Sequence, residues 1–137
     1  ADLVRYERMA GAAAEVSEFG SAATPEGVER LRAVSAYHQL RAGTSYPAAL
    51  VTARLGDDRV EPWQAAKLAA GLQHVGGRPV LLRVDDGARP RRDEELADRY
   101  AVLFWQLGDP AFAPPPPPQP APTAPAATPE LAPAPRS

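Results

Sequence analysis

The sequence predicts an α/β fold in which parallel strands are joined by crossover helices, and two observations support it. Two short apolar segments of strand length, 47–53 and 79–84, are separated by a segment with helical periodicity. Further helical patterns precede the first strand and follow the second. Helices and strands that alternate in this way are typical of a parallel sheet with right-handed crossovers.

The first third of the chain is predicted to be helical or irregular. Residues 1–20 have the pattern of the end of one element, followed by a connector rich in small residues. Thr24 and Pro25 are the residue types of a helix start, with Thr24 as the N-cap and Pro25 at the first helical position. This helix is expected to end near Val34, and a loop is expected over residues 35–45.

The two strands are expected over 47–53 and 79–84, each buried on both faces, because their apolar residues do not alternate with polar ones. The helix between them should begin at Pro62 or Trp63 and end at Gly76. Two such strands alone would leave unpaired apolar edges, so we expect the sheet to need further strands. The apolar stripe of the intervening helix follows the 3.6-residue period and comprises Ala65, Leu68, Ala69, Leu72 and Val75.

A polar loop is predicted over 85–92, followed by a last helix. Asp93 is expected to cap that helix, and Gly108 to end it. Its buried stripe should consist of Leu96, Tyr100, Leu103 and Leu107.

The end of the chain has the composition of a disordered tail. Of the 17 prolines, 12 lie from Pro110 onward, and residues 113–137 are almost all Pro, Ala, Thr and Gln. Such a segment cannot bury enough apolar surface to offset its ordering entropy. We therefore divide the chain into a folded part, 1–112, and a Pro/Ala-rich disordered tail, 113–137. Residues 114–118 favour polyproline II, and a PxxP ligand for SH3-like domains is an alternative to a passive tail.

Composition excludes several classes of function. The net charge of −2 and the scattered arginines argue against nucleic-acid binding. The absence of cysteine excludes disulfides, thiol catalysis and thiolate zinc sites. No apolar run approaches the length of a membrane span, so no membrane partner and a cytoplasmic location are expected. The chain begins with Ala1 rather than Met, and we interpret this as a truncated record of a longer protein.

Several short segments, in order and with matching spacing, resemble the C-terminal part of the catalytic domain of prolyl oligopeptidase-family (S9) serine peptidases. The resemblance implies part of an α/β-hydrolase domain that hydrolyses peptide bonds in short peptides through a Ser-His-Asp acyl-enzyme mechanism. It also implies that the missing N-terminal part of that domain and a β-propeller belong to the parent protein, and it implies no cofactor. The matching segments are 2–6, 16–21, 35–38, 46–48, 57–60, 67–70 and 79–84.

The resemblance assigns roles to three residues of one turn. Asp57 matches the catalytic Asp, Arg59 matches an Arg that hydrogen-bonds a substrate carbonyl, and Val60 matches an apolar residue of the proline pocket. The nucleophile turn of the family would precede Ala1, and the loop over 85–92, where the family carries its His, contains none. The chain as given is therefore expected to be inactive.

The same resemblance places the aromatic residue that stacks on a substrate proline at about Glu15, so proline specificity is doubtful. His38 and His74 are the only other bases, and neither follows the second strand. A metal site built from Asp85-Asp86 and Glu94-Glu95 is a remote alternative, because no His accompanies these acids.

Other interpretations of the acid turn remain open. Asp57 would also fit as a turn acid that caps the following helix, and Asp58 as a turn residue or a partner of Arg59. Arg59 would also fit as an ordinary salt-bridge residue. For the whole chain, the alternatives are a degenerate, non-catalytic hydrolase that binds a partner, and an interaction module that works through its proline-rich tail.

Overall fold

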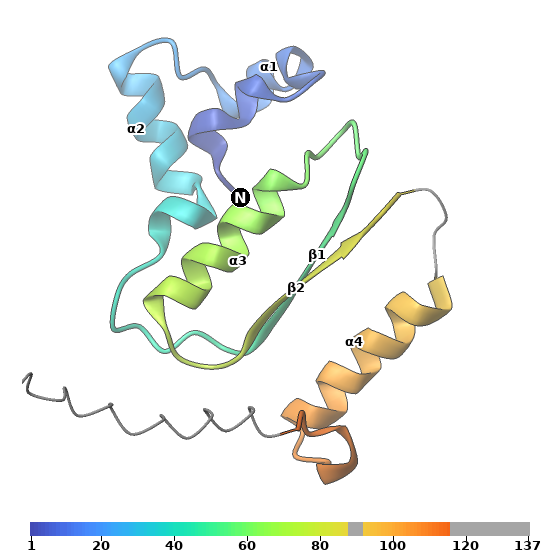
Figure 1. The fold of residues 1–137 in the computed structure, drawn as a ribbon. Coiled ribbons are helices and arrows are strands. Elements are labelled where there is room, and N and C mark those ends of the chain that lie inside the picture. Colours follow the sequence, from blue (N-terminus) through green and yellow to red (C-terminus); the bar gives the residue numbers. More distant parts are fainter. Residues whose placement is uncertain (88–91, 116–137) are drawn as a thin grey trace, which may run out of the picture.

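The computed structural model describes residues 1–87 and 92–115, and within them the predicted order of helices and strands is confirmed. Four short 3₁₀ turns accompany the regular elements (Figure 1). In chain order the elements are η1 (Leu3–Arg8), η2 (Ala12–Glu15), α1 (Val16–Phe19), α2 (Pro25–Val34), η3 (Ala36–Gln39), β1 (Ala49–Arg54), α3 (Trp63–Val75), β2 (Val80–Asp85), α4 (Arg92–Gln106) and η4 (Pro110–Phe112).

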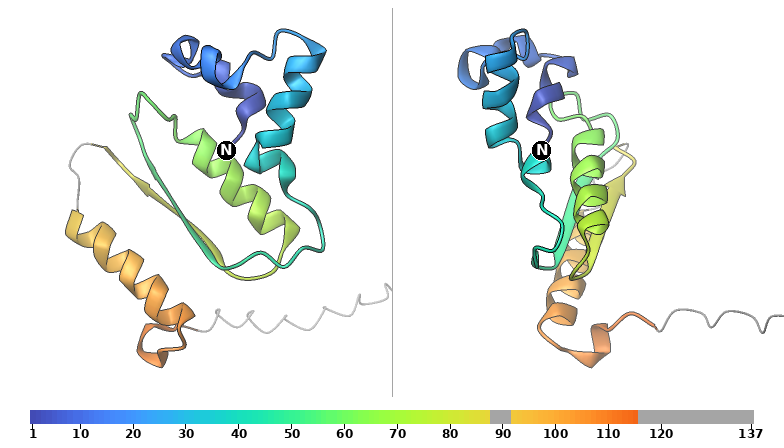
Figure 2. Two further views of the ribbon diagram at one scale, coloured as in Figure 1. Left: turned by 180° about the vertical axis from the view of Figure 1, so that it is seen from behind. Right: turned by 90° about the vertical axis from the view of Figure 1, so that its left-hand side faces the viewer.

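The strands β1 and β2 pair in parallel, with a register that runs from Ala49 opposite Val80 to Arg54 opposite Asp85. The helix α3 is the crossover between them and lies on one side of the strands, while α4 lies on the other side (Figures 1 and 2). Because the strands are parallel, both carboxyl ends reach the same edge of the sheet. The α/β class is thereby confirmed, and this edge is where the chemistry of such sheets is usually found.

Local sequence signals set the helix ends as expected. The Thr24 hydroxyl accepts a hydrogen bond from the backbone N–H of Gly27 at 3.1 Å, and Pro25 is the first residue of α2. At the end of α3, Gly76 has a φ of 78°, a left-handed conformation that a side chain would make costly. The loop predicted over 35–45 contains the additional turn η3.

The hydrophobic core lies in the N-terminal helical part rather than at the sheet. Tyr6, Ala12 and Leu31 are buried together. The Tyr6 hydroxyl donates a hydrogen bond to the carbonyl of Gly20, and its ring meets that of Phe19 edge to face. These contacts join η1, η2, α1 and α2 into one helical layer, seen at the top of Figure 1.

A cluster of buried polar groups attaches this helical layer to α3. The Gln64 side chain accepts a hydrogen bond from the Asp2 N–H at 2.6 Å and donates one to the Asp2 carbonyl at 3.0 Å. The Asp2 carboxylate, with 1% of the residue exposed, forms an ion pair with Lys67. The Lys67 ammonium also lies 4.2 Å from the centre of the Tyr37 ring. Satisfied polar groups of this kind hold the start of α3 against η1.

The expectation that both strands are buried on both faces is wrong. On β2, Leu81, Leu82 and Val84 remain 40%, 37% and 46% exposed. The reason is geometric: the described residues provide only two strands, and a strand is buried on both faces only when helices cover both sides of a wider sheet.

The predicted burial of the α4 stripe is also wrong, because Leu96, Tyr100, Leu103 and Leu107 are all exposed. The helix stands off from the sheet, and a cavity of about 470 Å³ separates β1 from α4, lined among others by Leu50 and Leu103. In addition, α4 begins at Arg92, so Asp93 lies in its first turn and is not its cap. An acid in the first turn still favours the helix through the macrodipole.

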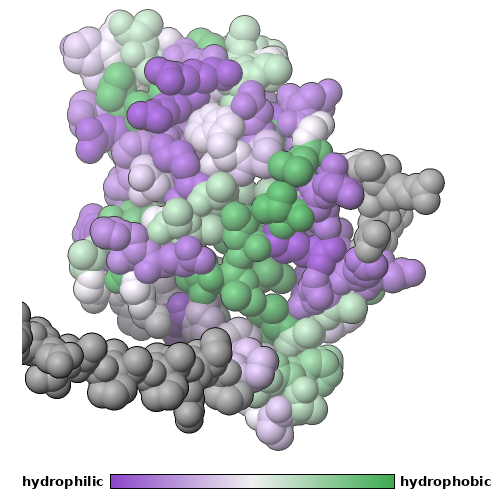
Figure 3. Space-filling model, in the orientation of Figure 1, coloured by the Kyte–Doolittle hydropathy of each residue, from purple (hydrophilic) through white to green (hydrophobic). Residues whose placement is uncertain are grey.

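The exposed apolar side chains of β2 and α4 form a broad apolar surface, which crosses the middle of the face seen in Figure 3. We expect the isolated chain to self-associate through it, because open strand edges and apolar faces recruit further chains. Size-exclusion chromatography with light scattering should show a mass above the 14.5 kDa monomer. Replacing Leu82 and Val84 together by Lys should restore the monomer, and a monomeric wild-type chain at 100 μM would contradict the expectation.

Two expectations from the sequence remain, one about the C-terminal tail and one about membrane spans. Most of the predicted tail, from residue 116 onward, lies outside the described residues. Among the described residues, no helix is long and apolar enough to cross a membrane.

Candidate functional site

The candidate site is the turn over residues 55–60, which follows β1. The Leu55 N–H donates to the carbonyl of Asp85 at 2.8 Å, so the ends of both strands are joined. Gly87, with a φ of 77°, lies so close to this turn that a Cβ on it would be 2.1 Å from the Leu55 carbonyl oxygen. Only glycine fits there, and the loop after β2 therefore starts directly against the turn after β1.

Asp57 closes this turn with its own side chain. Its Oδ1 accepts hydrogen bonds from the N–H groups of Arg59 and Val60, at 3.0 and 2.8 Å. Those two hydrogen bonds hold the pKa of the Asp57 carboxyl below its usual range, and the bond from Val60 contributes more than the bond from Arg59. The carboxylate is ionised at neutral pH, and within the described residues its Oδ2 accepts no hydrogen bond. It can therefore accept one from an incoming imidazole N–H.

The helix-capping interpretation of Asp57 is wrong. The residue before α3 is Pro62, which offers no side-chain cap, and among the described residues the Asp57 side chain accepts hydrogen bonds only within its own turn. This arrangement is an Asx-type turn that ends at Val60, two residues before the N-cap Pro62 of α3.

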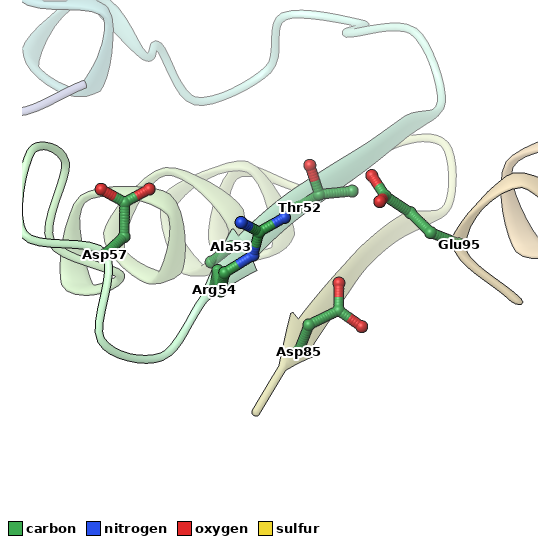
Figure 4. A pocket seen from close by; sticks show the side chains of 6 residues that line it. All are labelled: Thr52, Ala53, Arg54, Asp57, Asp85 and Glu95. Carbon is green, nitrogen blue, oxygen red and sulfur yellow. The ribbon is translucent and has the colours of Figure 1, made fainter. Parts of the chain in front are cut away.

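A cavity of about 220 Å³ lies at the carboxyl edge of the sheet (Figure 4). The Arg54 side chain extends beside Asp57, and its charge contributes to the lowered pKa of that residue. Asp85 from β2 and Glu95 from α4 reach the same cavity. The cavity is lined by Thr52, Ala53, Arg54, Asp57, Asp85 and Glu95.

Asp85 is already engaged by an arginine that the sequence analysis did not single out. Arg83 donates to Asp85 at 2.7 Å and forms an ion pair with Asp98 of α4. The hydrogen bond to Asp85, together with the charges of Asp85, Glu94 and Glu95, raises the pKa of Arg83 above its ordinary value. The i, i+2 spacing of Arg83 and Asp85 on one strand face was the available signal, since such residues point the same way.

Neither Arg59 nor Val60 lines this first cavity. Arg59 lines a second cavity, and among the described residues it forms no ion pair, with Asp58 or with any other acid. The salt-bridge interpretation therefore finds no support in the described part of the chain. Val60 is about half exposed and donates its N–H to Asp57.

A serine, a histidine and an aspartate meet elsewhere in the structure, but they do not form a catalytic triad. His38 Nδ1 lies 2.8 Å from Ser35 Oγ and 3.8 Å from Asp2 Oδ1. Both contacts use the same ring nitrogen, whereas a triad needs one nitrogen for each partner. The fully buried Ser35 hydroxyl donates a hydrogen bond to the Ala1 carbonyl, so Nδ1 is the donor to Oγ. The Leu3 N–H also donates to this oxygen, and Ser35 is a structural residue.

The other candidates suggested by the sequence are His74 and the acids considered as metal ligands. His74 is exposed in the last turn of α3, where a cation is favourable. Among residues 1–87 and 92–115, no group of three His, Cys, Asp or Glu residues could hold a metal ion.

The family model of the prolyl oligopeptidase family matches residues 1–101. The chain belongs to the prolyl oligopeptidase family. It is 34% identical over 119 residues to the dual function macrocyclase-peptidase POPB of Galerina marginata, covering 79% of this chain and 16% of that protein. It is also 34% identical over 117 residues to the prolyl endopeptidase of Elizabethkingia miricola, covering 78% of this chain and 17% of that enzyme.

Solved structures of this family share the fold. A chain from a structural and mechanistic analysis of two prolyl endopeptidases superposes with a TM-score of 0.70 at 35% identity, covering 77% of this chain and 17% of that one. The α/β-hydrolase assignment is confirmed by this likeness. The prolyl oligopeptidase-family chain described here spans about a sixth of the length of the curated relatives it matches.

Proposed function

We propose that this chain supplies the acid-bearing part of a prolyl oligopeptidase-type active site. Asp57 is the group that orients a catalytic histidine and stabilises its imidazolium. Arg59 holds a backbone carbonyl of the peptide substrate, and Val60 forms part of an apolar wall. The observation that carries the proposal is the ionised Asp57 carboxylate, fixed by two backbone N–H groups at the carboxyl edge of a parallel sheet.

The nucleophile and the base come from outside this set of residues. No serine of the chain lies in a nucleophile-elbow sequence, and neither histidine follows β2. In the proposed parent enzyme, the nucleophile-bearing part of the hydrolase domain and a β-propeller complete the site, and the substrate is a short peptide.

The 137-residue chain alone should hydrolyse no peptide above background. Removing members of a triad removes several orders of magnitude in rate, so benzyloxycarbonyl-Gly-Pro-p-nitroanilide should not be turned over. The release of p-nitroaniline measures this, with the Elizabethkingia miricola enzyme as the positive control. Turnover that disappears in Asp57→Asn would contradict the prediction, because it would reveal a complete site within this chain.

A second candidate function is that of a hydrolase-like protein without catalysis, and the sequence of residues 85–92, which has no His, favours it. A hybrid peptidase separates the two. In this hybrid, residues 1–84 of the present chain replace the matching segment of the Elizabethkingia miricola enzyme. All residues before and after that segment are those of the Elizabethkingia miricola enzyme. An active hybrid supports the proposed role of the Asp57 turn, and a folded but inactive hybrid supports the non-catalytic alternative.

A further inference from the structure

A second cavity, of about 260 Å³, adjoins the acid turn, and the proposed triad chemistry makes no use of it. Asp58 and Arg59 form one wall, while Met9 and Ala12 belong to the opposite wall, together with Glu15. Its volume is below the roughly 300–1,000 Å³ of pockets that hold drug-sized ligands, so it suits a single side chain. The helical layer and the acid turn, distant in sequence, thus enclose a small subsite.

Glu15 is the acid that the helical layer contributes to this cavity. It is the last residue of η2, directly before α1, and its side chain is half-buried. Among the described residues, no side chain or backbone group forms an ion pair or hydrogen bond with its carboxylate. A half-buried carboxylate without a partner gains most from a cation that brings its own hydrogen-bond donors.

The composition of the walls agrees with a cationic occupant. Glu15 and Asp58 carry two negative charges against the single positive charge of Arg59, which leaves the cavity with one net negative charge. Met9, Gly11 and Ala12 offer apolar surface along which the methylene stem of a long side chain can lie. A cationic head and an apolar stem are the two parts of a lysine or arginine side chain.

We propose that this cavity binds a lysine or arginine side chain of a peptide, and that Glu15 selects it. The inference rests on the proposed function, because the cavity is a substrate subsite only if the neighbouring turn belongs to a peptidase site. A proline ring in the same place would displace water from Glu15 and give the carboxylate no partner in return, so proline is selected against.

The first test uses the full 137-residue chain and three peptide amides, N-acetyl-Gly-Arg-amide, its citrulline analogue and its proline analogue. Citrulline has nearly the shape of arginine without its charge. Titrations followed by ¹H–¹⁵N NMR should show the arginine amide binding roughly tenfold more tightly than the other two, the effect of one charge-assisted hydrogen bond. The backbone signals of Gly11, Ala12 and Arg59 should move during that titration.

Two variants of the full chain complete the first test. Glu15→Gln should remove the preference for arginine over citrulline. Glu18→Gln is the matched control, because Glu18 is exposed on α1 and does not line the cavity. Equal affinity for the three amides, or a preference that survives in Glu15→Gln, overturns the inference.

The second test uses the hybrid peptidase and separates a failure of this inference from a failure of the proposed function. The hybrid should cleave an arginyl substrate with a kcat/KM at least tenfold above that for the prolyl substrate, and Glu15→Gln should abolish this ratio. A hybrid that prefers the prolyl substrate overturns the role of Glu15 and leaves the role of Asp57 standing. A folded hybrid that cleaves neither overturns the proposed function, and the inference with it.

Discussion

In the hybrid peptidase, Asp57→Asn should lower kcat by about 10⁴-fold, the scale found when the orienting acid of a serine peptidase triad loses its charge. The reason is that Asn cannot stabilise the imidazolium and does not enforce the required tautomer. Its side-chain oxygen can still accept the two hydrogen bonds from Arg59 and Val60, so the turn itself should persist. Steady-state kinetics measures the change, on whichever of the arginyl and prolyl substrates the hybrid cleaves faster.

Glu18→Gln, the control of the titration experiment, is also the control here. Glu18 is exposed on α1 and lines neither cavity, and its replacement likewise removes one negative charge. We expect it to change kcat by less than about threefold, because an exposed charge is well screened by solvent. If Asp57→Asn retained more than a tenth of the activity, Asp57 would be a turn residue only.

Asp2→Ala should lower the free energy of unfolding by about 3–5 kcal/mol, because it leaves Lys67 of α3 and the backbone N–H of Arg5 in η1 without the buried carboxylate that they share. Urea denaturation followed by circular dichroism measures this loss. Glu95→Gln, which breaks the ion pair of Glu95 with Arg99 on the surface of α4, serves as the control. It should cost only about 0.3–0.5 kcal/mol, and equal effects of the two changes would contradict the assigned role of Asp2.

The same ion pair predicts how stability depends on pH. Burial alone would raise the pKa of the Asp2 carboxyl, but the hydrogen bond from Lys67, with the charges of Lys67 and His38, holds it below the ordinary value of 3.8. Because the pKa is lower in the folded chain than in the unfolded one, this contribution is fully present above about pH 4. It is lost as the pH falls through the folded-state pKa.

A comparison of urea midpoints at pH 7 and pH 3 tests this dependence. The wild-type chain should lose more stability between the two values than Asp2→Asn, which has no carboxylate to protonate at this position. The difference between the two proteins isolates Asp2 from the other acids of the chain. A variant with the same pH dependence as the wild type would show that Asp2 is not linked to acid unfolding.

Burial was the property that sequence reasoning predicted least well. The apolar runs of β1 and β2 and the stripe of α4 are the usual signals of buried elements, yet Leu82, Val84 and Leu103 remain 37%, 46% and 49% exposed. Periodicity tells which side chains need cover, but it does not tell whether the residues at hand can supply that cover. Ala12, which forms the actual core together with Tyr6 and Leu31, lies in the segment whose small residues had suggested a connector.

Local chemistry allowed this sequence by itself to determine where its elements begin and end. The cap at Thr24, the left-handed Gly76 and the acid turn at Asp57 each depend on neighbours within a few residues. The tertiary structure alone decided which distant groups meet. It placed Ser35 and His38 in a structural cluster with Asp2, and it enclosed a cavity between Glu15 and Arg59. Such contacts depend on how whole elements pack, so they cannot be predicted from the spacing of residues in the sequence.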